Sequence, residues 1–295
     1  MNKTNVSSDV LERLTEESPD LAPETRKAAT CVLENPQDVS VSTVRQIAEA
    51  AQVKPNTMMR MARQVGFEGY DGFREPFCDE IRRGTATFPD RARCLQNMRA
   101  KGDMGTLYAD MVGSALRNIE DTFSTIDEET QKAAADAIWS SRQVFTLGVG
   151  VMSANARNFT YLASTGMAQF HAIPRPGSAA IDDLAWVDGC DVLIAMSYKP
   201  YRAEVVNAVN LAREQNTQII GISDSPASPI FRVADHKFLV AADTPQYFPS
   251  SISTIALLET LLSFVIAGVD AGIVERVETF HARRHRLGLH WTDES

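Results

Sequence analysis

The feature that most constrains this chain is a doubled amphipathic pattern between Thr43 and Val65. Apolar residues recur at helical spacing in its first half, and the same spacing returns in its second half. Three residues separate the halves, and Pro55 then stands where the first turn of a helix tolerates proline. Two short helices joined by a tight turn are therefore predicted, a helix-turn-helix. The residues that set the two stripes are Val44, Ile47, Ala48 and Ala51, then Met58, Met61, Ala62 and Val65.

The outward face of the second predicted helix has the composition of a surface that reads DNA. No acidic residue occurs from Lys54 to Phe67, and arginine and asparagine remain outside the apolar stripe. In the major groove arginine pairs with guanine and asparagine with adenine, whereas flanking cations bind phosphate. We assign base contacts to Asn56 and Arg60. The predicted contact set is Lys54, Asn56, Thr57, Met59, Arg60 and Arg63.

The same spacing also fits a two-helix corner of any α-helical domain with a solvated basic face. The flanking residues favour the first interpretation, because residues 21–75 resemble the DNA-binding domain of the RpiR/MurR family of bacterial transcription regulators. This chain departs from the family pattern at Gln52, where glycine is usual, and at Lys54, where a small hydroxyl residue usually caps the helix. The resemblance rests on Glu34-Asn35-Pro36, Ile47-Ala48-Glu49, Thr57, Arg60, Ala62, Gly66-Phe67, Gly69-Tyr70 and Phe73.

Composition is that of an ordinary soluble globular protein, with 44% hydrophobic and 23% charged residues. The net charge of -9 argues against indiscriminate nucleic-acid binding, but a local basic face can still bind DNA. The four cysteines form no CxxC pair and have no histidine at metal spacing, so we expect reduced thiols, a cytoplasmic location, and neither metal nor cofactor. No signal peptide or membrane span is expected, and the apolar stretch 255–267 is predicted to be a buried helix.

The chain is long enough for two domains. Gly, Pro and charged residues cluster after Arg82, which places a boundary there. Arg91 and its basic neighbours could reach the DNA backbone, although a solvated linker fits them better. The predicted divisions are 9–85, an all-α helix-turn-helix domain; 86–127, a linker and connecting helix; 128–275, an α/β domain; and 276–295, a tail.

The second half of the chain alternates between short apolar runs and helical patterns. Because each run is followed by a helical segment, the region is predicted to be an α/β domain with a parallel sheet flanked by helices. In such a sheet, small molecules bind at the carboxyl ends of the strands. The five predicted strands are residues 143–147, 168–173, 191–196, 218–222 and 236–240.

The turns after these strands resemble the sugar isomerase (SIS) domain, which the RpiR/MurR family carries behind its DNA-binding domain. The resemblance covers about residues 133–267 and implies a domain that senses phosphorylated sugars or related metabolites and that dimerises. By position it implicates Gly148, Gly150, Ser197, the loop from Tyr198 to Arg202, and Ser250 and Ser251.

One loop differs from the family pattern in its chemistry. Where small hydroxyl residues usually wrap a phosphate, this chain has Ser197-Tyr198-Lys199-Pro200-Tyr201-Arg202. Two cations and two phenol rings favour an anionic effector held by ion pairs, such as a carboxylate, a sulfonate or a differently bound phosphate. Lys199, Tyr198, Tyr201 and Arg202 are therefore the predicted contacts. Solvated turn residues in a degenerate site are the alternative.

These features together predict a transcriptional regulator without catalytic residues, whose SIS domain senses a small anionic metabolite and alters binding to a palindromic operator. A homodimer or homotetramer is expected, because two recognition helices must lie about 34 Å apart, or a multiple of that, to read a palindrome. The alternative is a SIS-type sugar-phosphate isomerase, with Glu204 or His171 as its base.

Overall fold

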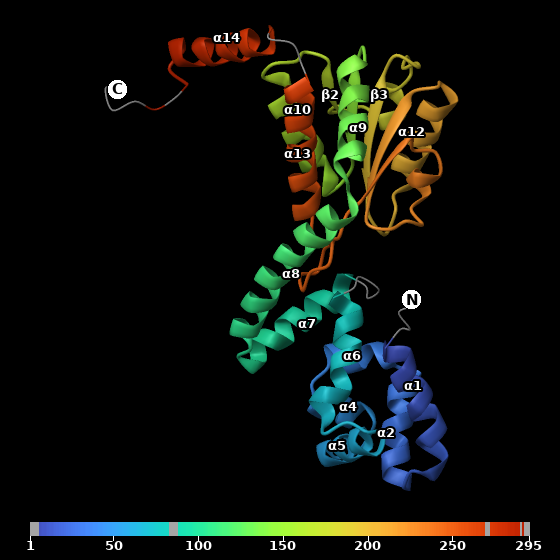
Figure 1. Cartoon of the computed structure of the whole chain (residues 1–295). Helices are drawn as coiled ribbons and strands as arrows, with labels where there is room; N and C mark the ends of the chain where they lie inside the picture. Colours follow the sequence, from blue (N-terminus) through green and yellow to red (C-terminus); the bar gives the residue numbers. More distant parts are fainter. Residues whose placement is uncertain (1–5, 83–87, 269–271, 290, 292–295) are drawn as a thin grey trace. The chain divides into compact units, whose positions relative to one another are not determined.

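The computed structural model describes residues 6–82, 88–268, 272–289 and 291, and Figure 1 follows the chain through them. Contacts divide the chain into two compact units, residues 1–116 with 243–250 and residues 117–242 with 251–295. The first unit is helical and the second contains the sheet, so the expected fold class is confirmed. Residues 83–87, which include the domain boundary predicted at residue 85, lie outside the described residues. So do residues 290 and 292–295 of the predicted tail.

The helical unit has a core made by its first six α-helices. Residues from Val10 to Phe77 form one buried apolar cluster, in which Leu14, Met58 and Met61 are fully enclosed. The helices are α1 (Val6–Glu17), α2 (Pro23–Glu34), α3 (Pro36–Val41), α4 (Val44–Ala50), α5 (Pro55–Gln64) and α6 (Tyr70–Arg82), and a 3-10 turn, η1 (Ser18–Asp20), joins the first two.

The helix-turn-helix is α4 and α5. Thr43 and Gln46 form a reciprocal capping box at the start of α4, which satisfies backbone N–H groups that have no helical partner. Gln52 has φ +54°, so the turn has the left-handed conformation that explains why glycine is usual there. Arg13 of α1 donates to the carbonyl of Val65, at the end of α5. A cation on the last carbonyls of a helix is stabilising, and α1 thereby supports α5.

Two parts of the helical unit differ from the sequence expectations. The break at Glu34-Asn35-Pro36 ends α2, but Pro36 is also the first residue of α3, which was not predicted. The segment expected as a linker begins with α7 (Phe88–Lys101), which was not predicted, whereas α8 (Met104–Thr125) is the expected connecting helix.

Arg91 of α7 neither lies in a solvated linker nor is free to reach DNA. Its side chain is 2% exposed and donates to the carbonyl of Thr244 at 2.6 Å. Burial lowers the pKa of this guanidinium, and the nearby Asp243 opposes that shift. Phe88 packs on Phe248 with ring centroids 4.4 Å apart, so residues 243–250 belong structurally to the helical unit.

The second unit is a five-stranded sheet in the order β2-β1-β3-β4-β5, and all its neighbouring strands are parallel. The predicted strands agree with the observed ones to within two residues at each end. The strands are β1 (Val144–Gly148), β2 (Phe170–Ile173), β3 (Val192–Ser197), β4 (Gln218–Ser223) and β5 (His236–Leu239). The helical elements are α9 (Glu128–Ser140), α10 (Met152–Ser164), α11 (Ala180–Asp183), α12 (Ala203–Glu214), η2 (Pro229–Arg232), α13 (Ile252–Gly268) and α14 (Gly272–Arg286).

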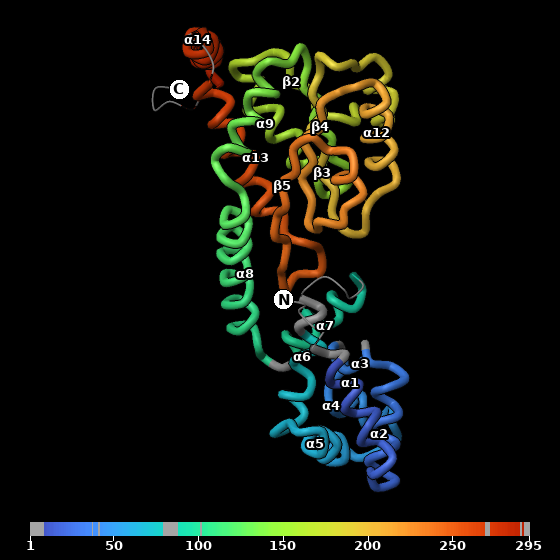
Figure 2. The backbone as a smooth tube through the Cα atoms, turned by 45° about the vertical axis from the view of Figure 1, so that its right-hand side comes forward, coloured from blue at the N-terminus to red at the C-terminus, as the bar shows by residue number. Residues whose placement is uncertain are grey.

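Helices cover both faces of the sheet, which explains why β3 is buried along its whole length. One apolar cluster joins one face to α9, α10 and α13. A second cluster joins the other face to α11, α12 and η2. Figures 1 and 2 show α12 on the side of the sheet away from α9 and α13.

Helix α13 is the buried helix expected from the apolar stretch 255–267. Leu257, Leu261 and Val265 are enclosed in the cluster beneath it. Among the described residues no single helix is long and apolar enough to cross a membrane, and one bent pair, α13 with α14, reaches that measure by length and composition alone.

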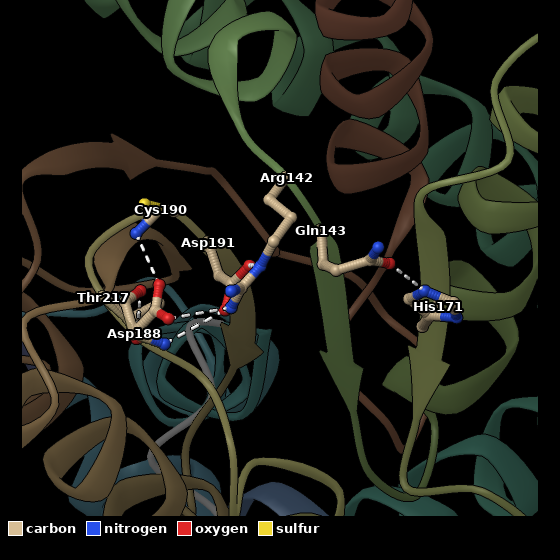
Figure 3. A network of polar contacts seen from close by, with 7 residues as sticks. All are labelled: Arg142, Gln143, His171, Asp188, Cys190, Asp191 and Thr217. Atoms are coloured by element: carbon tan, nitrogen blue, oxygen red, sulfur yellow. Dashed lines mark hydrogen bonds and ion pairs between the residues drawn. The ribbon is translucent and has the colours of Figure 1, made fainter.

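A polar network joins the segments that precede β1 and β3 (Figure 3). The buried carboxylate of Asp191 accepts from Nε of Arg142 at 3.0 Å and from Nη2 at 2.6 Å, and it also accepts from the N–H of Asp188 at 3.0 Å. Nearby, His171 is hydrogen-bonded through Nε2 to Gln143. This network lies at the amino ends of the strands, so His171 is not near the carboxyl ends where ligands of parallel sheets bind.

Candidate functional site

Helix α5 presents the polar face that the sequence predicted. Lys54, Asn56, Met59, Arg60 and Arg63 are all exposed, whereas the opposite side of the helix is buried in the core. The Lys54 side chain does not cap the N–H groups at the start of α5, and it is exposed to solvent. These five exposed side chains therefore lie along one continuous face, with the Asn56 amide near the amino end of the helix.

Thr57 was wrongly expected on this face. Its side chain is only 8% exposed, because it lies one turn before Met61 on the side that packs into the core. We therefore exclude Thr57 from the candidate contact set.

The charges of this face are unneutralised within the part of the chain that the structure describes. Neither Lys54, Arg60 nor Arg63 forms an ion pair there, and Arg63 donates through Nε to the carbonyl of Glu68 at 3.1 Å. Arg45 of α4 is exposed as well and adds a cation that the sequence reading missed. Its position beside the inward Val44 is the signal that could have found it.

The carboxyl end of β1 forms one wall of a candidate ligand site. A Cβ on Gly148 would stand 2.2 Å from the carbonyl oxygen of Met152, so only glycine allows α10 to approach β1 this closely. Gly150 has φ +63° in the turn that follows. A cavity of about 190 Å³ opens here, lined by Gly148, Val149, Gly150, Ser153, Ala156, Arg157, Ala172, Ile173 and Pro174.

Ser153 and Arg157 line this cavity from α10, and the sequence reading assigned neither. They are four residues apart and therefore share a helix face. That spacing, directly after the glycine turn, is the signal that could have identified them. Since α10 begins at Met152, its positive dipole end also faces this region, where it favours an anion.

The loop after β3 brings Arg202 to the same place. Nη1 of Arg202 is 3.3 Å from where a Cβ on Gly150 would stand, so the guanidinium lies against the glycine turn. Among the described residues neither Arg157 nor Arg202 has an ion-pair partner. Two cations from separate elements thus lie beside the carboxyl end of β1.

Other predicted residues of this loop stabilise it. Ser197 is buried, and its carbonyl accepts from Oγ of Ser223 at 2.6 Å. The backbone N–H of Lys199 donates to both carboxylate oxygens of Asp224 at 3.3 Å. The Lys199 side chain remains exposed, as does the adjacent Pro200.

Tyr198 does not offer an exposed ring to a ligand. It is 7% exposed within the core, where its hydroxyl is hydrogen-bonded to Thr254 of α13, and burial raises its pKa. Tyr201 is half-buried, and its hydroxyl has no hydrogen-bond partner among the described atoms. Ser251 directly precedes α13, whereas Ser250 belongs to the segment that groups with the helical unit.

The two residues considered as catalytic bases lie in different parts of the second unit. His171 lies at the amino ends of the strands, and Glu204 is half-buried in the first turn of α12. The described residues contain no group of three or more His, Cys, Asp or Glu side chains able to hold a metal ion. The four cysteines form no disulfide with one another.

Comparisons with known proteins match both halves of the chain. Residues 8–83 match the model of the helix-turn-helix domain of the rpiR family, and residues 137–267 match that of the SIS domain. An uncharacterised HTH-type transcriptional regulator of Haemophilus influenzae is 23% identical over 90% of this chain and 92% of its own length. The HTH-type transcriptional regulator HexR of Pseudomonas aeruginosa is 22% identical over 88% of this chain and 89% of its own.

Two solved structures share the fold. The sugar isomerase domain of an RpiR transcription factor from Sphaerobacter thermophilus has a TM-score of 0.55 and 25% identity, covering 61% of this chain and 98% of that one. The Vibrio vulnificus NanR protein, complexed with ManNAc-6P, has a TM-score of 0.54 and 19% identity, covering 94% of this chain and 98% of its own.

Proposed function

The chain belongs to the RpiR family of transcriptional regulators, with an RpiR-type helix-turn-helix followed by a SIS domain, and from that premise we propose that α5 reads an operator whose occupancy is controlled by a small anion bound in the SIS domain. The observation that carries the proposal is the exposed face of α5, which combines an amide with cations and has no acidic residue.

The proposed DNA contacts divide into two kinds. Asn56 and Arg60 have side chains that form paired hydrogen bonds with adenine and guanine, so they would read bases. Lys54, Arg63 and Arg45 would bind phosphates and fix the position of the helix on the duplex. Met59 would contact a thymine methyl group, or a deoxyribose that lies between the base contacts and the phosphate contacts.

The proposed effector is an anion of a sugar phosphate or a related carboxylate or sulfonate. Arg157 and Arg202 are unpaired cations beside the carboxyl end of β1, and the start of α10 adds the positive end of a helix dipole. Lys199 supplies a third cation from an exposed position. The phosphosugar in the NanR complex makes phosphorylated amino sugars the first compounds to test.

A homodimer or homotetramer would couple the two activities. Two recognition helices read a palindrome only when their separation matches the helical repeat of DNA. An effector that favours one arrangement of the protomers therefore changes operator affinity by its differential affinity for the two arrangements.

Fluorescence anisotropy on DNA upstream of the protein's own gene tests the DNA-reading role. Asn56→Ala and Arg60→Ala should each weaken specific binding by about 1–3 kcal/mol, roughly 5- to 150-fold, and relax discrimination from scrambled DNA. The double variant Lys54→Gln with Arg63→Gln should instead weaken binding to all sequences and reduce the salt slope by about 2.

Lys27→Ala is the matched control, since it removes an exposed cation of α2 that pairs with Glu24. Its operator affinity should equal that of the wild type. Loss of affinity in the control equal to that of Arg60→Ala would contradict the assignment of α5 as the reading element.

Calorimetry tests the effector site with N-acetylmannosamine 6-phosphate, glucose 6-phosphate, and carboxylate and sulfonate analogues. Arg202→Ala and Arg157→Ala should each weaken binding of an active compound by tenfold or more, because each removes a charge-assisted hydrogen bond. Micromolar binding of ordinary hexose phosphates that is unchanged in both variants would sink the proposed site.

The isomerase alternative gains no support from its two candidate bases. Isomerisation needs a positioned base beside the substrate carbon. His171 is hydrogen-bonded to Gln143 at the amino ends of the strands, and Glu204 lies in the first turn of α12, where the helix dipole favours a carboxylate.

A further inference from the structure

The connection between β4 and β5 is unusually short for a parallel crossover. It contains only η2, four residues long, whereas the β1–β2 and β3–β4 crossovers carry the longer helices α10 and α12; the β2–β3 crossover carries α11, which is also four residues long. Phe231 of η2 covers Gly221 of β4, with a ring carbon 3.2 Å from the position of a Cβ on that glycine. A short turn covers little of a sheet face, so the outer strand β5 stays open on this side.

A cavity of about 530 Å³ occupies the uncovered region. This volume falls within the range of small-molecule sites, which is roughly 300–1,000 Å³. Lys237 and Leu239, two residues apart on β5, both point to this face of the sheet. The lining residues are Pro226, Ala227, Ser228, Phe231, Arg232, Lys237 and Leu239.

The lining carries positive charge without a visible partner. Arg232 and Lys237 are exposed, and in the described part of the chain neither forms an ion pair. The nearby carboxylate of Asp235 is instead bonded to Arg213 at 3.0 Å and to the N–H of Ile219 at 2.9 Å. The two cations therefore face the cavity uncompensated.

Ser228, a residue with a buried hydroxyl group, also belongs to the lining of the cavity. Ser228 is 1% exposed, and its Oγ has no hydrogen-bond partner among the described atoms. It precedes η2 but does not cap it. Because a buried hydroxyl without a partner is unfavourable, this Oγ is suited to donate to a group that enters the cavity.

We infer that this hollow is a second ligand site, which takes an organic anion with a compact apolar group. Arg232 and Lys237 would pair with the anionic end, and Ser228 would donate a hydrogen bond. Phe231 and Leu239 would contact the apolar part. The site shares no lining residue with the cavity beside Gly148, so the inference stands independently of the proposed effector site.

Methyl NMR on the full-length protein tests the inference, because alanine labelling reports on both cavities. Ala227 lines the hollow, whereas Ala156 and Ala172 line the cavity beside Gly148. The probes are phenyl phosphate and benzoate, which distinguish phosphate from carboxylate recognition, and phenol, which lacks the charge. At least one anionic probe should shift the Ala227 resonance at millimolar concentration, and phenol should bind at least tenfold more weakly.

Variants then assign the interactions. Arg232→Gln with Lys237→Gln should weaken probe binding at Ala227 by tenfold or more. Ser228→Ala should weaken it three- to tenfold without lowering the thermal midpoint, because the native hydroxyl has no internal partner to lose. Lys132→Gln, an exposed lysine on α9, and Arg157→Gln in the other cavity should leave binding at Ala227 unchanged.

Three results would overturn the inference. In the first, neither anion shifts Ala227 up to 10 mM, or the shifts occur at Ala156 alone. In the second, the double Gln variant binds the probe as tightly as the wild type. In the third, phenol binds as tightly as the anions, which would make the hollow a merely apolar surface.

Discussion

Substituting Gly148 by alanine should disrupt the joint between β1 and α10 more than any comparable glycine change in this unit. The added Cβ would stand 2.2 Å from the carbonyl oxygen of Met152 and 2.7 Å from its carbonyl carbon, whereas real Cβ atoms essentially never lie below 3.0 Å. The helix start must therefore move by about 0.8 Å. A backbone carbonyl held in a helix cannot rotate away as a side chain would.

The free energy of unfolding should fall by about 3 kcal/mol, the upper end of the usual cost of overpacking. The smaller conformational entropy of unfolded alanine returns roughly 0.4–1 kcal/mol and reduces the loss slightly. With a urea m-value of about 2–3 kcal/mol/M, the midpoint should drop by about 1 M. Gly148→Ala should also weaken effector binding, because the displaced α10 carries Ser153 and Arg157.

Urea unfolding followed by tryptophan fluorescence measures the stability of the second structural unit, because Trp139, Trp186 and Trp291 all belong to it. Gly189→Ala is the matched control, because its Cβ would meet its nearest neighbour at 3.4 Å, an ordinary contact. A midpoint for Gly148→Ala within 0.2 M of that of Gly189→Ala would refute the reasoning from close approach.

Three further predictions concern stability. Met61→Ala should lower the free energy of unfolding of the helical unit by about 3 kcal/mol, measured by circular dichroism in urea, because it opens a cavity in the core beneath α5. Tyr198→Phe should cost about 1–2 kcal/mol in the same assay, because it leaves the buried hydroxyl of Thr254 without its partner. Burial disfavours charged Asp183, but hydrogen bonds from the N–H and Nε of Arg175 and from Ser178 outweigh it and lower the pKa of this carboxyl. The stability it provides is therefore complete above the unfolded pKa of about 3.9 and is lost as pH falls through the lower folded value. Asp183→Asn should be destabilised by about 2 kcal/mol at pH 7, and its difference from the wild type should shrink as the pH falls through the folded pKa.

The spacing of apolar residues predicted the helices and strands that bury one or both faces, because burial is what imposes that spacing. The stripes of α4 and α5 and the five apolar runs of the sheet were recognisable because each buries one side or both. Helix α3 is six residues long, too short for a stripe to repeat, and its Pro36 marks a stop and a start equally well. The neighbours of each strand depend on crossovers between distant segments, so the strand order was not predicted.

The exposure of the candidate site residues was predicted best where the type of side chain alone decides whether it lies at the surface. The cations of α5 could be assigned because charged side chains rarely lie in a core. Thr57 could not, since threonine is compatible with both environments. Arg91 is the opposite exception, a charged residue buried through a contact 153 residues away in sequence, and no local pattern predicts such a partner.

The segment 243–250 has a consequence for how this protein could be recombined with others. The structural unit that contains α7 is completed by residues encoded more than a hundred positions later, through the bond from Arg91 to Thr244 and the packing of Phe88 on Phe248. The apolar core of α1 to α6, by contrast, is built from residues between Val10 and Phe77. A chimeric regulator that keeps its own α7, α8 and 243–250 together and exchanges only the helices before them would therefore transfer this core whole and would have to re-form only the contact of α3 with α7. A graft cut after α7 would instead separate Arg91 from its acceptor, Thr244.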